Sequence, residues 1–301
     1  MLFLNYAEFY LTNVCNLSCP GCNRFNSFNF KGHQRWSDLK DTYTKWAKVL
    51  HLGNFGILGG EPLLNPNFMD WLIGTTDLWP KSTCRLTTNG FRLNKVKGLY
   101  DVLKSRPKIQ MSVGIHNKMH KREIMNILEE FLAGPLKIEH DNSNKYQQKL
   151  YITDSNDVKV RVEYNWWFHQ GAIIPNDQGK LTLHNSDPDK AHSICHSSEC
   201  HHFAYGKLYK CGASALFSEF DEQIGLELDS KDRELINNVN SLSVDDDLET
   251  QKLFIENIKN PIPQCKFCPE VYIGDQIFAL KKKDILAQQR ESTNEIFRVN
   301  T

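Results

Sequence analysis

The chain has 301 residues, of which 40% are hydrophobic and 24% are charged. This composition is typical of a globular protein and excludes disordered and collagen-like classes, and no apolar run approaches the roughly 20 residues that span a bilayer. The 36 basic and 36 acidic residues cancel, so no overall charge attracts nucleic acid or an anionic membrane, and we expect neither as a partner.

Nine cysteines are a high count for a chain whose first residues, MLFLNYAEFYLT, lack the basic stretch and long apolar core of a signal peptide. We therefore expect a cytoplasmic protein. A reducing compartment keeps cysteines as thiols, so clustered cysteines indicate metal ligands or catalytic groups before disulfides. Eight of them fall into two groups, and the ninth, Cys84, lies in a strand pattern and is expected to be a buried core residue.

Segments that alternate with period two recur between longer amphipathic stretches over the first 190 residues or so, a pattern typical of a βα series. The predicted strands cover 3–12, 54–58, 83–88, 109–115, 137–140 and 158–164, and the polar loop before the last of them leaves room for a short strand at 150–153. The predicted helices cover 37–52, 66–76, 93–104 and 119–133. Strands separated by helices predict an α/β fold with a parallel sheet curled into an open, partial (β/α)6 barrel.

Beyond about residue 190 the alternation gives way to a stretch rich in Cys, His and turn residues. We place a domain boundary there. The sequence predicts a core barrel over 1–190, a small cysteine-containing domain over 191–274, and an amphipathic C-terminal helix and tail over 275–301.

Cys15, Cys19 and Cys22 directly follow the first predicted strand, with the spacing CxxxCxxC. Barrel-like α/β folds build their active sites at the carboxyl ends of the strands. Three thiolates on one short loop can hold three irons of a cubane cluster and leave the fourth iron open to a small molecule. The alternative is a structural zinc site, which needs a fourth ligand and rarely has this spacing.

The three-cysteine motif resembles the hallmark of the radical S-adenosylmethionine (SAM) superfamily. Gly59-Gly60-Glu61-Pro62, at the end of the second strand, is similar to the family's GGEP segment, and its two glycines let the backbone approach a ligand closely. The resemblance implies a [4Fe–4S] cluster on the three cysteines and SAM bound by residues 59–62, with Glu61 as charge partner of the SAM amino group. The turn around Asn89 also resembles the family, and we include Asn89 among the SAM contacts. Gly21 departs from the pattern, because an aromatic residue usually precedes the third cysteine and touches adenine.

The inward face of the predicted strands is polar, which is costly unless water, SAM and a polar substrate satisfy it. By their position in the family pattern, Ser112 and His116 are expected to contact the ribose or carboxylate of SAM. Arg161 and Glu163 are candidate catalytic residues that hold SAM or substrate. The alternative is that these two residues pair with each other and only brace the barrel.

The second group of cysteines begins at Cys195, which is followed by ten residues, Gly206, four residues and Cys211. This spacing resembles the opening of the SPASM and twitch extensions of the radical SAM superfamily, and Cys265-Lys-Phe-Cys268 adds a pair. The resemblance implies a second, auxiliary [4Fe–4S] cluster on Cys195, Cys211, Cys265 and Cys268. Cys200 is left over and either replaces Cys195, donates hydrogen as a candidate catalytic residue, or has no role. A zinc knuckle using nearby histidines is the alternative for the whole group.

The resemblance implies an enzyme that reductively cleaves SAM to a 5′-deoxyadenosyl radical and abstracts hydrogen from a substrate, with an electron donor such as flavodoxin or ferredoxin. The chain opens directly on its first predicted strand, and with the polar interior this favours a small polar substrate: a sugar, cyclitol, amino acid or nucleotide. The expected outcome is oxidation or rearrangement assisted by the auxiliary cluster. One alternative is a peptide epimerase or crosslinking enzyme; another is a non-catalytic iron–sulfur electron-transfer or zinc-binding protein.

Overall fold

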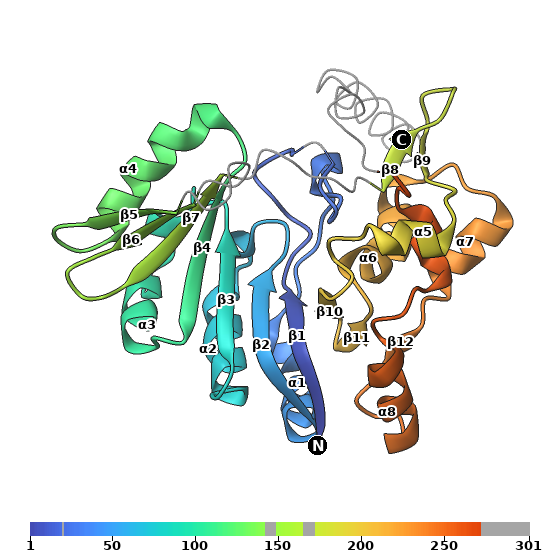
Figure 1. The fold of residues 1–301 in the computed structure, drawn as a ribbon, viewed down its shortest axis with the longest axis horizontal. Helices are drawn as coiled ribbons and strands as arrows, with labels where there is room; N and C mark the ends of the chain where they lie inside the picture. Colours follow the sequence, from blue (N-terminus) through green and yellow to red (C-terminus); the bar gives the residue numbers. More distant parts are fainter. Residues whose placement is uncertain (20, 142–148, 165–171, 272–301) are drawn as a thin grey trace, which may run out of the picture.

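A mostly parallel sheet of ten strands runs through the molecule in the order β12-β11-β10-β1-β2-β3-β4-β7-β6-β5 (Figure 1). The computed structural model describes residues 1–19, 21–141, 149–164 and 172–271. The six parallel strands are β10 (His201–Ala204), β1 (Leu2–Tyr10), β2 (Leu50–Leu58), β3 (Thr83–Thr88), β4 (Ile109–Ile115) and β7 (Lys159–Tyr164). The chain is therefore an α/β protein. The strands on its two margins are antiparallel: β11 (Lys207–Tyr209), β12 (Ser241–Leu242), β6 (Lys149–Thr153) and β5 (Lys137–Asp141).

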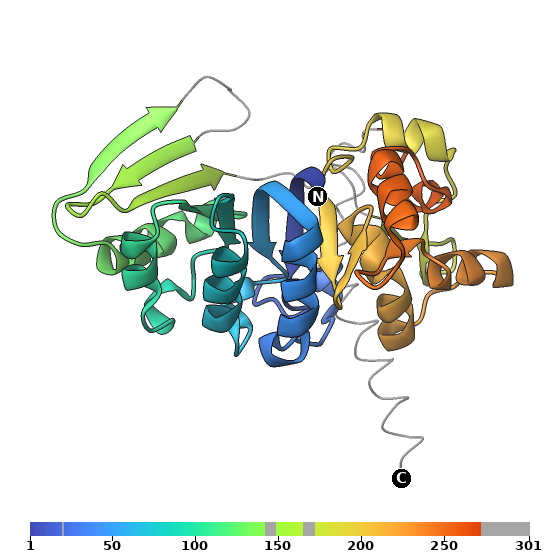
Figure 2. The same cartoon turned by 90° about the horizontal axis from the view of Figure 1, so that it is seen from below.

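The four helices of the first half lie along one face of the sheet (Figure 2), and the first three of them connect successive parallel strands. They are α1 (Trp36–Val49), α2 (Phe68–Leu78), α3 (Leu99–Ser105) and α4 (Lys121–Phe131). Each lies within the predicted range or a few residues from it. The strands turn alternate side chains toward these helices. Cys84 and Leu86 of β3 are fully buried in this core, which confirms the prediction for Cys84.

Residues 137–140 do not form a parallel strand of the βα series, and that part of the prediction is wrong. β5 pairs antiparallel with β6, which pairs antiparallel with β7, so β7 is the strand beside β4. Only a short turn separates β6 from β7, and strands joined by a short turn can pair only in the antiparallel sense. The strand allowed for at 150–153 is present as β6.

The last third of the chain builds a second, helical part beside β1. Its elements are β8 (Ile173–Pro175), β9 (Leu181–Leu183), α5 (Pro188–Ser193), α6 (Gly212–Ile224), α7 (Ser230–Asn237), α8 (Leu248–Asn257) and the 3-10 helix η5 (Pro263–Phe267). β10 lies beyond the predicted domain boundary at residue 190 and yet pairs with β1, Ala7 opposite His201. The predicted helix over 275–301 lies outside the described residues.

An aromatic cluster joins the loop after the first strand to this helical part. Phe25 stacks on Phe217 of α6 with 5.4 Å between ring centroids, and Phe217 meets Phe267 of η5 edge-on at 5.6 Å. All three rings are buried. Aromatic pairs of this kind contribute about 0.5–1.5 kcal/mol beyond the area they bury, so they hold the two cysteine-bearing regions in a fixed relation.

Candidate functional site

The thiols of Cys15, Cys19 and Cys22 lie on the loop between β1 and the 3-10 helix η1 (Asn26–Phe28). The N–H of Leu17 donates to Cys15 Sγ over 3.4 Å, and the N–H of Cys22 donates to the carbonyl of Cys19 over 3.2 Å. The pKa of the Cys15 and Cys19 thiols is raised to about 12, mainly by burial and in part by the neighbouring Cys22. The three sulfur atoms therefore share one partly buried region at the carboxyl end of β1.

The end of β2 is hydrogen-bonded directly to this loop. The N–H of Gly60 donates to the carbonyl of Thr12 over 2.6 Å, and the N–H of Glu61 donates to the carbonyl of Val14 over 2.8 Å. A Cβ on Gly59 would lie 2.7 Å from the Thr12 oxygen, and one on Gly60 would overlap the Val14 carbonyl. The two glycines are thus required for the close approach of two backbones, and they fix the segment that leads into Cys15.

The carboxylate of Glu61 joins the end of β2 to the end of β3. Glu61 is 1% exposed, and it accepts hydrogen bonds from the hydroxyl of Thr88 (2.7 Å), the N–H of Asn89 (2.7 Å) and the N–H of Leu63 (3.1 Å). Burial raises its pKa to about 7, and these hydrogen bonds oppose the rise. The carboxylate stabilises the turn that carries Asn89; its role as charge partner of SAM stays a prediction.

Asn89 lies beside the cysteine loop. Its Nδ2 donates to Asn16 Oδ1 over 2.8 Å and lies 4.0 Å from Cys15 Sγ. Pro62, the first residue of the 3-10 helix Pro62–Leu64, is buried behind Glu61. The predicted contacts on β2 and β3 therefore converge on the same end of the sheet as the three thiols.

Two further predicted contacts come from β4 and the residue that follows it. His116 folds back over Gly114, where an added Cβ would lie 2.9 Å from His116 Nε2. Ser112 lies deeper in the strand, and its hydroxyl accepts a 3.3 Å hydrogen bond from Arg161 Nε. Arg161 Nε also lies 2.7 Å from Glu163 Oε1. Arg161 and Glu163 are thus paired, as the alternative interpretation of the sequence had it.

Four of the five later cysteines line one small cavity: Cys195, Cys211, Cys265 and Cys268. They come from separate elements, because Cys195 follows α5, Cys211 is the N-cap residue of α6, and the last two lie in and just after η5. Burial raises the pKa of Cys265 to about 11 and that of Cys268 well above its usual value.

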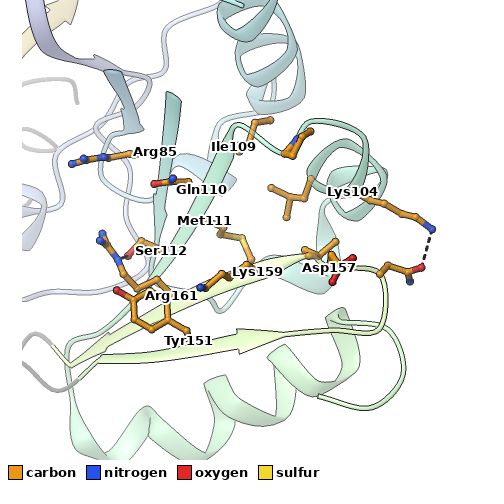
Figure 3. A pocket seen from close by; sticks show the side chains of 14 residues that line it. Arg85, Lys104, Ile109, Gln110, Met111, Ser112, Tyr151, Asp157, Lys159 and Arg161 are labelled. Carbon is orange, nitrogen blue, oxygen red and sulfur yellow. Dashed lines mark hydrogen bonds between the residues drawn. The ribbon is translucent and has the colours of Figure 1, made fainter. Parts of the chain in front are cut away.

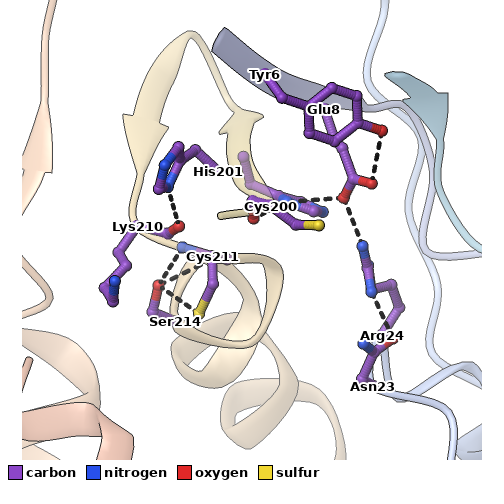
Figure 4. Close-up of polar contacts among 10 residues, drawn as sticks. Tyr6, Glu8, Asn23, Arg24, Cys200, His201, Lys210, Cys211 and Ser214 are labelled. Carbon is purple, nitrogen blue, oxygen red and sulfur yellow. Dashed lines mark hydrogen bonds and ion pairs between the residues drawn. The ribbon is translucent and has the colours of Figure 1, made fainter. Parts of the chain in front are cut away.

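Cys200 does not line that cavity and instead lies near Glu8 and Arg24 (Figure 4). Burial raises the pKa of its thiol to about 12; Glu8 raises it further and Arg24 opposes the rise. Glu8 accepts hydrogen bonds from Tyr6 Oη (3.0 Å) and the Arg24 guanidinium (2.6 Å). The two groups of cysteines are therefore linked through a polar cluster between them.

His202 completes this polar cluster. Its Nδ1 lies 3.2 Å from Glu8 Oε2 and 3.4 Å from the carbonyl oxygen of Cys200, and burial holds its pKa well below the usual range. Its Nε2 and the Nε of Arg24 are buried without a hydrogen-bond partner among the described residues. Sequence analysis missed Arg24, which lies two residues after Cys22, and considered His202 only as one of the histidines that could complete a zinc knuckle.

Over the part of the chain that the structure describes, no three His, Cys, Asp or Glu side chains are arranged to hold a metal ion. The thiolates of a cubane cluster bind different irons, whereas all ligands of a zinc site converge on one ion. Within the same described residues, no helix is long and apolar enough to span a membrane.

Comparison with known proteins gives one family match and several solved structures. Crystal structures of Streptococcus suis SuiB include one bound to S-adenosylmethionine; it is 21% identical over 37% of this chain and 25% of that chain, with a TM-score of 0.32. This chain therefore spans about a quarter of SuiB. BtrN, in complex with AdoMet and 2-DOIA, is 16% identical over 93% of this chain and 97% of its own, with a TM-score of 0.47. No curated protein matches.

The family match covers residues 9–128, which fit the model of the radical SAM superfamily. This segment contains the three-thiol loop, residues 59–62 and the turn at Asn89. The family implies an enzyme with a [4Fe–4S] cluster and SAM. Residues 9–128 of the chain thus resemble the radical SAM superfamily.

Proposed function

We propose that the chain is a radical SAM enzyme with a second, auxiliary [4Fe–4S] cluster, acting on a small polar substrate such as a sugar, cyclitol, amino acid or nucleotide. The observation that carries the proposal is the position of the three-thiol loop, which is hydrogen-bonded to Gly60 and Glu61 inside the segment that matches the family. An electron donor such as flavodoxin or ferredoxin would reduce the cluster.

The residues at the first site fit a cluster with one open iron. Cys15, Cys19 and Cys22 would each bind one iron, and their protons would leave on assembly, because only thiolates are ligands. When reduced, such a cluster supplies the electron that cleaves SAM to a 5′-deoxyadenosyl radical. Asn89 donates toward Cys15 Sγ, and hydrogen bonds to a cluster sulfur tune its potential.

The SAM molecule would lie along the ends of β2, β3 and β4. Gly59, Gly60 and Pro62 offer backbone groups beside the cysteine loop, while Glu61 holds the neighbouring turn in place. His116 lies at the same end of the sheet, after β4. Ser112 is already engaged by Arg161, so we assign it the far edge of the SAM site.

The cavity lined by Cys195, Cys211, Cys265 and Cys268 fits the auxiliary cluster. Its four thiols can saturate four irons, and Phe217 belongs to the same lining. The ammonium of Lys210 is buried and donates to the carbonyl of Ile258 over 2.8 Å, placing one positive charge near the thiolates. Low exposure and nearby charge both tune a cluster potential. The cluster would accept the electron left after substrate oxidation.

The candidate catalytic residues have different surroundings. Arg161 and Glu163 neutralise each other on β7, so they are suited to positioning a polar substrate. Cys200 faces Glu8 and Arg24 between the two cysteine groups, outside the four-thiol cavity. We assign Cys200 to the substrate side of the auxiliary domain.

We also propose that the parallel strands form an open, partial barrel over 1–190 and that 191–274 is a twitch-like domain, with a helical tail over 275–301 in a cytoplasmic protein. In such a barrel, the polar groups of Tyr6, Glu8 and Arg161 would face the interior. Substrate oxidation would take place at the mouth of this barrel.

Iron content tests the proposal. The anaerobically reconstituted protein should hold about eight irons and eight sulfides, from two four-iron clusters, and should form 5′-deoxyadenosine from SAM when reduced. Replacing Cys15, Cys19 and Cys22 together by alanine should remove about half the iron and all SAM cleavage. Replacing Cys84, which is buried in the core, by alanine is the matched control and should leave both unchanged. Zinc in place of iron, or iron without SAM cleavage, would contradict the proposal.

A further inference from the structure

A cavity of about 460 Å³ lies at the amino ends of β4 and β7, away from both groups of cysteines (Figure 3). Its volume is within the range of sites for small molecules, roughly 300–1,000 Å³. Of the residues that line it, the radical SAM chemistry proposed above uses only Ser112 and Arg161, and its other proposed sites lie at the opposite ends of these strands. The cavity therefore needs its own explanation.

The sheet register places three cationic side chains on one face at this cavity. Arg85 of β3 lies opposite Gln110 of β4. One residue further along, Met111 lies opposite Val160 of β7, so Lys159 is level with Gln110. Because residues two apart in a strand share a face, Arg161 points to the same side as Lys159. All three cations line the cavity.

Arg85 and Lys159 form no ion pair in the described part of the chain, although Lys159 is near enough to Glu139 to contribute to lowering the pKa of that carboxyl group. The guanidinium of Arg85 lies 5.5 Å from the Tyr6 ring centroid, and the ammonium of Lys159 lies 4.6 Å from that of Tyr151. Neither makes an ion pair with a described acid, whereas Arg161 pairs with Glu163.

The rest of the lining leaves the cavity positive. Lys104 adds a fourth cation, and its ammonium donates to Asn156 Oδ1 over 3.1 Å. Asp157 is the one acidic residue among the described residues that line the cavity. The whole chain has no net charge, so this concentration of positive charge is local to the cavity.

We propose that this cavity binds the phosphoryl group of a small molecule, through Arg85, Lys159 and Arg161. Arginine presents a planar fork of donors that matches phosphate oxygens, and lysine adds a point charge. The hydroxyl of Ser112 and the amide of Gln110, both in the lining, add neutral donors. The enclosed volume suits a single sugar phosphate or nucleotide, and a nucleic-acid strand would need an extended basic groove.

The site is close enough to the proposed reaction centre for one molecule to reach both. Ser112 lies three residues before Ile115, the end of β4, which corresponds to about 10 Å of strand. The phosphoryl group therefore comes either from an organic phosphate of that length or from free phosphate. Both present the same oxygens to Arg85 and Lys159.

Calorimetry on the anaerobically reconstituted protein tests the site without relying on turnover. Pyrophosphate should bind once per chain, and Arg85→Gln and Lys159→Gln should each weaken binding about tenfold or more, because each removes a charge-assisted hydrogen bond. Arg122 and Lys252 are exposed on α4 and α8, and the matched controls Arg122→Gln and Lys252→Gln should bind as the wild type does. Thermal melting establishes that each variant is folded.

Three results would overturn the proposal: no saturable binding of pyrophosphate, equal weakening by the control variants, or equally tight binding of succinate, which has two carboxylates and no phosphoryl group. Ribose 5-phosphate and inorganic phosphate, measured in parallel, distinguish the source. Tighter binding of the sugar phosphate supports an organic ligand, and equal binding supports the same site for free phosphate. Because pyrophosphate binding requires neither the cluster nor SAM, a failure of the phosphoryl-site proposal can be distinguished from a failure of the proposed radical SAM function.

Discussion

Cys195 and Cys200 lie close together in sequence, and Cys195 and Cys211 both contribute to raising the pKa of the Cys200 thiol, yet only Cys195 lines the four-thiol cavity. Cys195 lines the small cavity with Cys211, Cys265 and Cys268. Cys200 lies at the edge of the polar cluster that includes Glu8 and Arg24. A cluster ligand must reach the same space as its three companions, so the geometry favours Cys195.

The assignment can be tested by removing each thiol from a chain that already lacks Cys15, Cys19 and Cys22. Cys195→Ala leaves one iron without its ligand and should lose most of the remaining iron, about four per chain. Cys200→Ala is the matched variant and should keep that iron and its electron paramagnetic resonance signal. If Cys200→Ala loses its iron while Cys195→Ala keeps it, the ligand assignment is wrong.

At the same scale, sequence spacing predicted that these candidate residues would lie together, but it did not predict the hydrogen bonds between them. The three thiols, residues 59–62 and Asn89 do gather at one end of the sheet, because loops after parallel strands meet there. The hydrogen bonds of the Glu61 carboxylate to Thr88 and Asn89 depend on how the strand ends are staggered. No spacing in the sequence encodes that stagger, and the same is true of the contact between Glu8 and His202.

At the scale of elements, the turn between β6 and β7 is held by one carboxylate. Asp154 is 5% exposed. Its Oδ1 accepts from the N–H groups of Asn156 and Val158, and its Oδ2 accepts from the N–H of Ala133 and the hydroxyl of Tyr100. The carboxylate thus joins the turn to the end of α4 and to α3. These hydrogen bonds lower the pKa of Asp154 although burial opposes them.

We expect Asp154→Asn to destabilise the protein by about 1–3 kcal/mol, because an amide nitrogen would face donors that now have an acceptor. Because the pKa of Asp154 is lowered in the folded protein, the stability that its carboxylate contributes is fully present above its pKa in the unfolded chain, near 3.8. That stability is lost as the pH falls through the lower pKa of the folded protein. Urea unfolding at neutral and acidic pH measures both effects. Asp157→Asn, in the same turn, is the control. If the difference in the free energy of unfolding between the wild type and Asp154→Asn is the same at acidic and neutral pH, the role assigned to the Asp154 carboxylate is wrong.

The sequence predicted the helices well and the sheet margins poorly. Helical periodicity is local, so α1 to α4 could be placed from their own residues. β7 pairs with β4 although β5 and β6 lie between them in the chain. This pairing depends on how β5, β6 and β7 assemble together. The alternation of Lys137 to His140 identifies a strand but carries no information about its direction.

At the scale of the whole molecule, the proposed auxiliary site ties together elements from the last third of the chain. Cys195, Cys211 and the pair Cys265 and Cys268 belong to three separate segments. A ligand that binds only the folded state stabilises it. Iron removal should therefore lower the urea midpoint and speed proteolysis beyond residue 190.

The control for that experiment is the chain that lacks Cys15, Cys19 and Cys22, which should keep the auxiliary cluster. Limited proteolysis followed by mass spectrometry should show its last third protected with iron and cleaved after chelation. Equal cleavage rates with and without iron would show that the four thiols do not hold a cluster that stabilises this region.

The pairing of β10 with β1 has a consequence for how the chain folds. β1 is synthesised well before β10, which is one of its two neighbouring strands. The two strands pair with Ala7 opposite His201. Closing so long a loop is slow, since its entropy must be lost before the contact forms. Until then β1 is an edge strand whose free N–H and C=O groups can pair with another chain. A nascent or truncated form that stops short of β10 is thus open to self-association along the same strand that leads into the three-thiol loop.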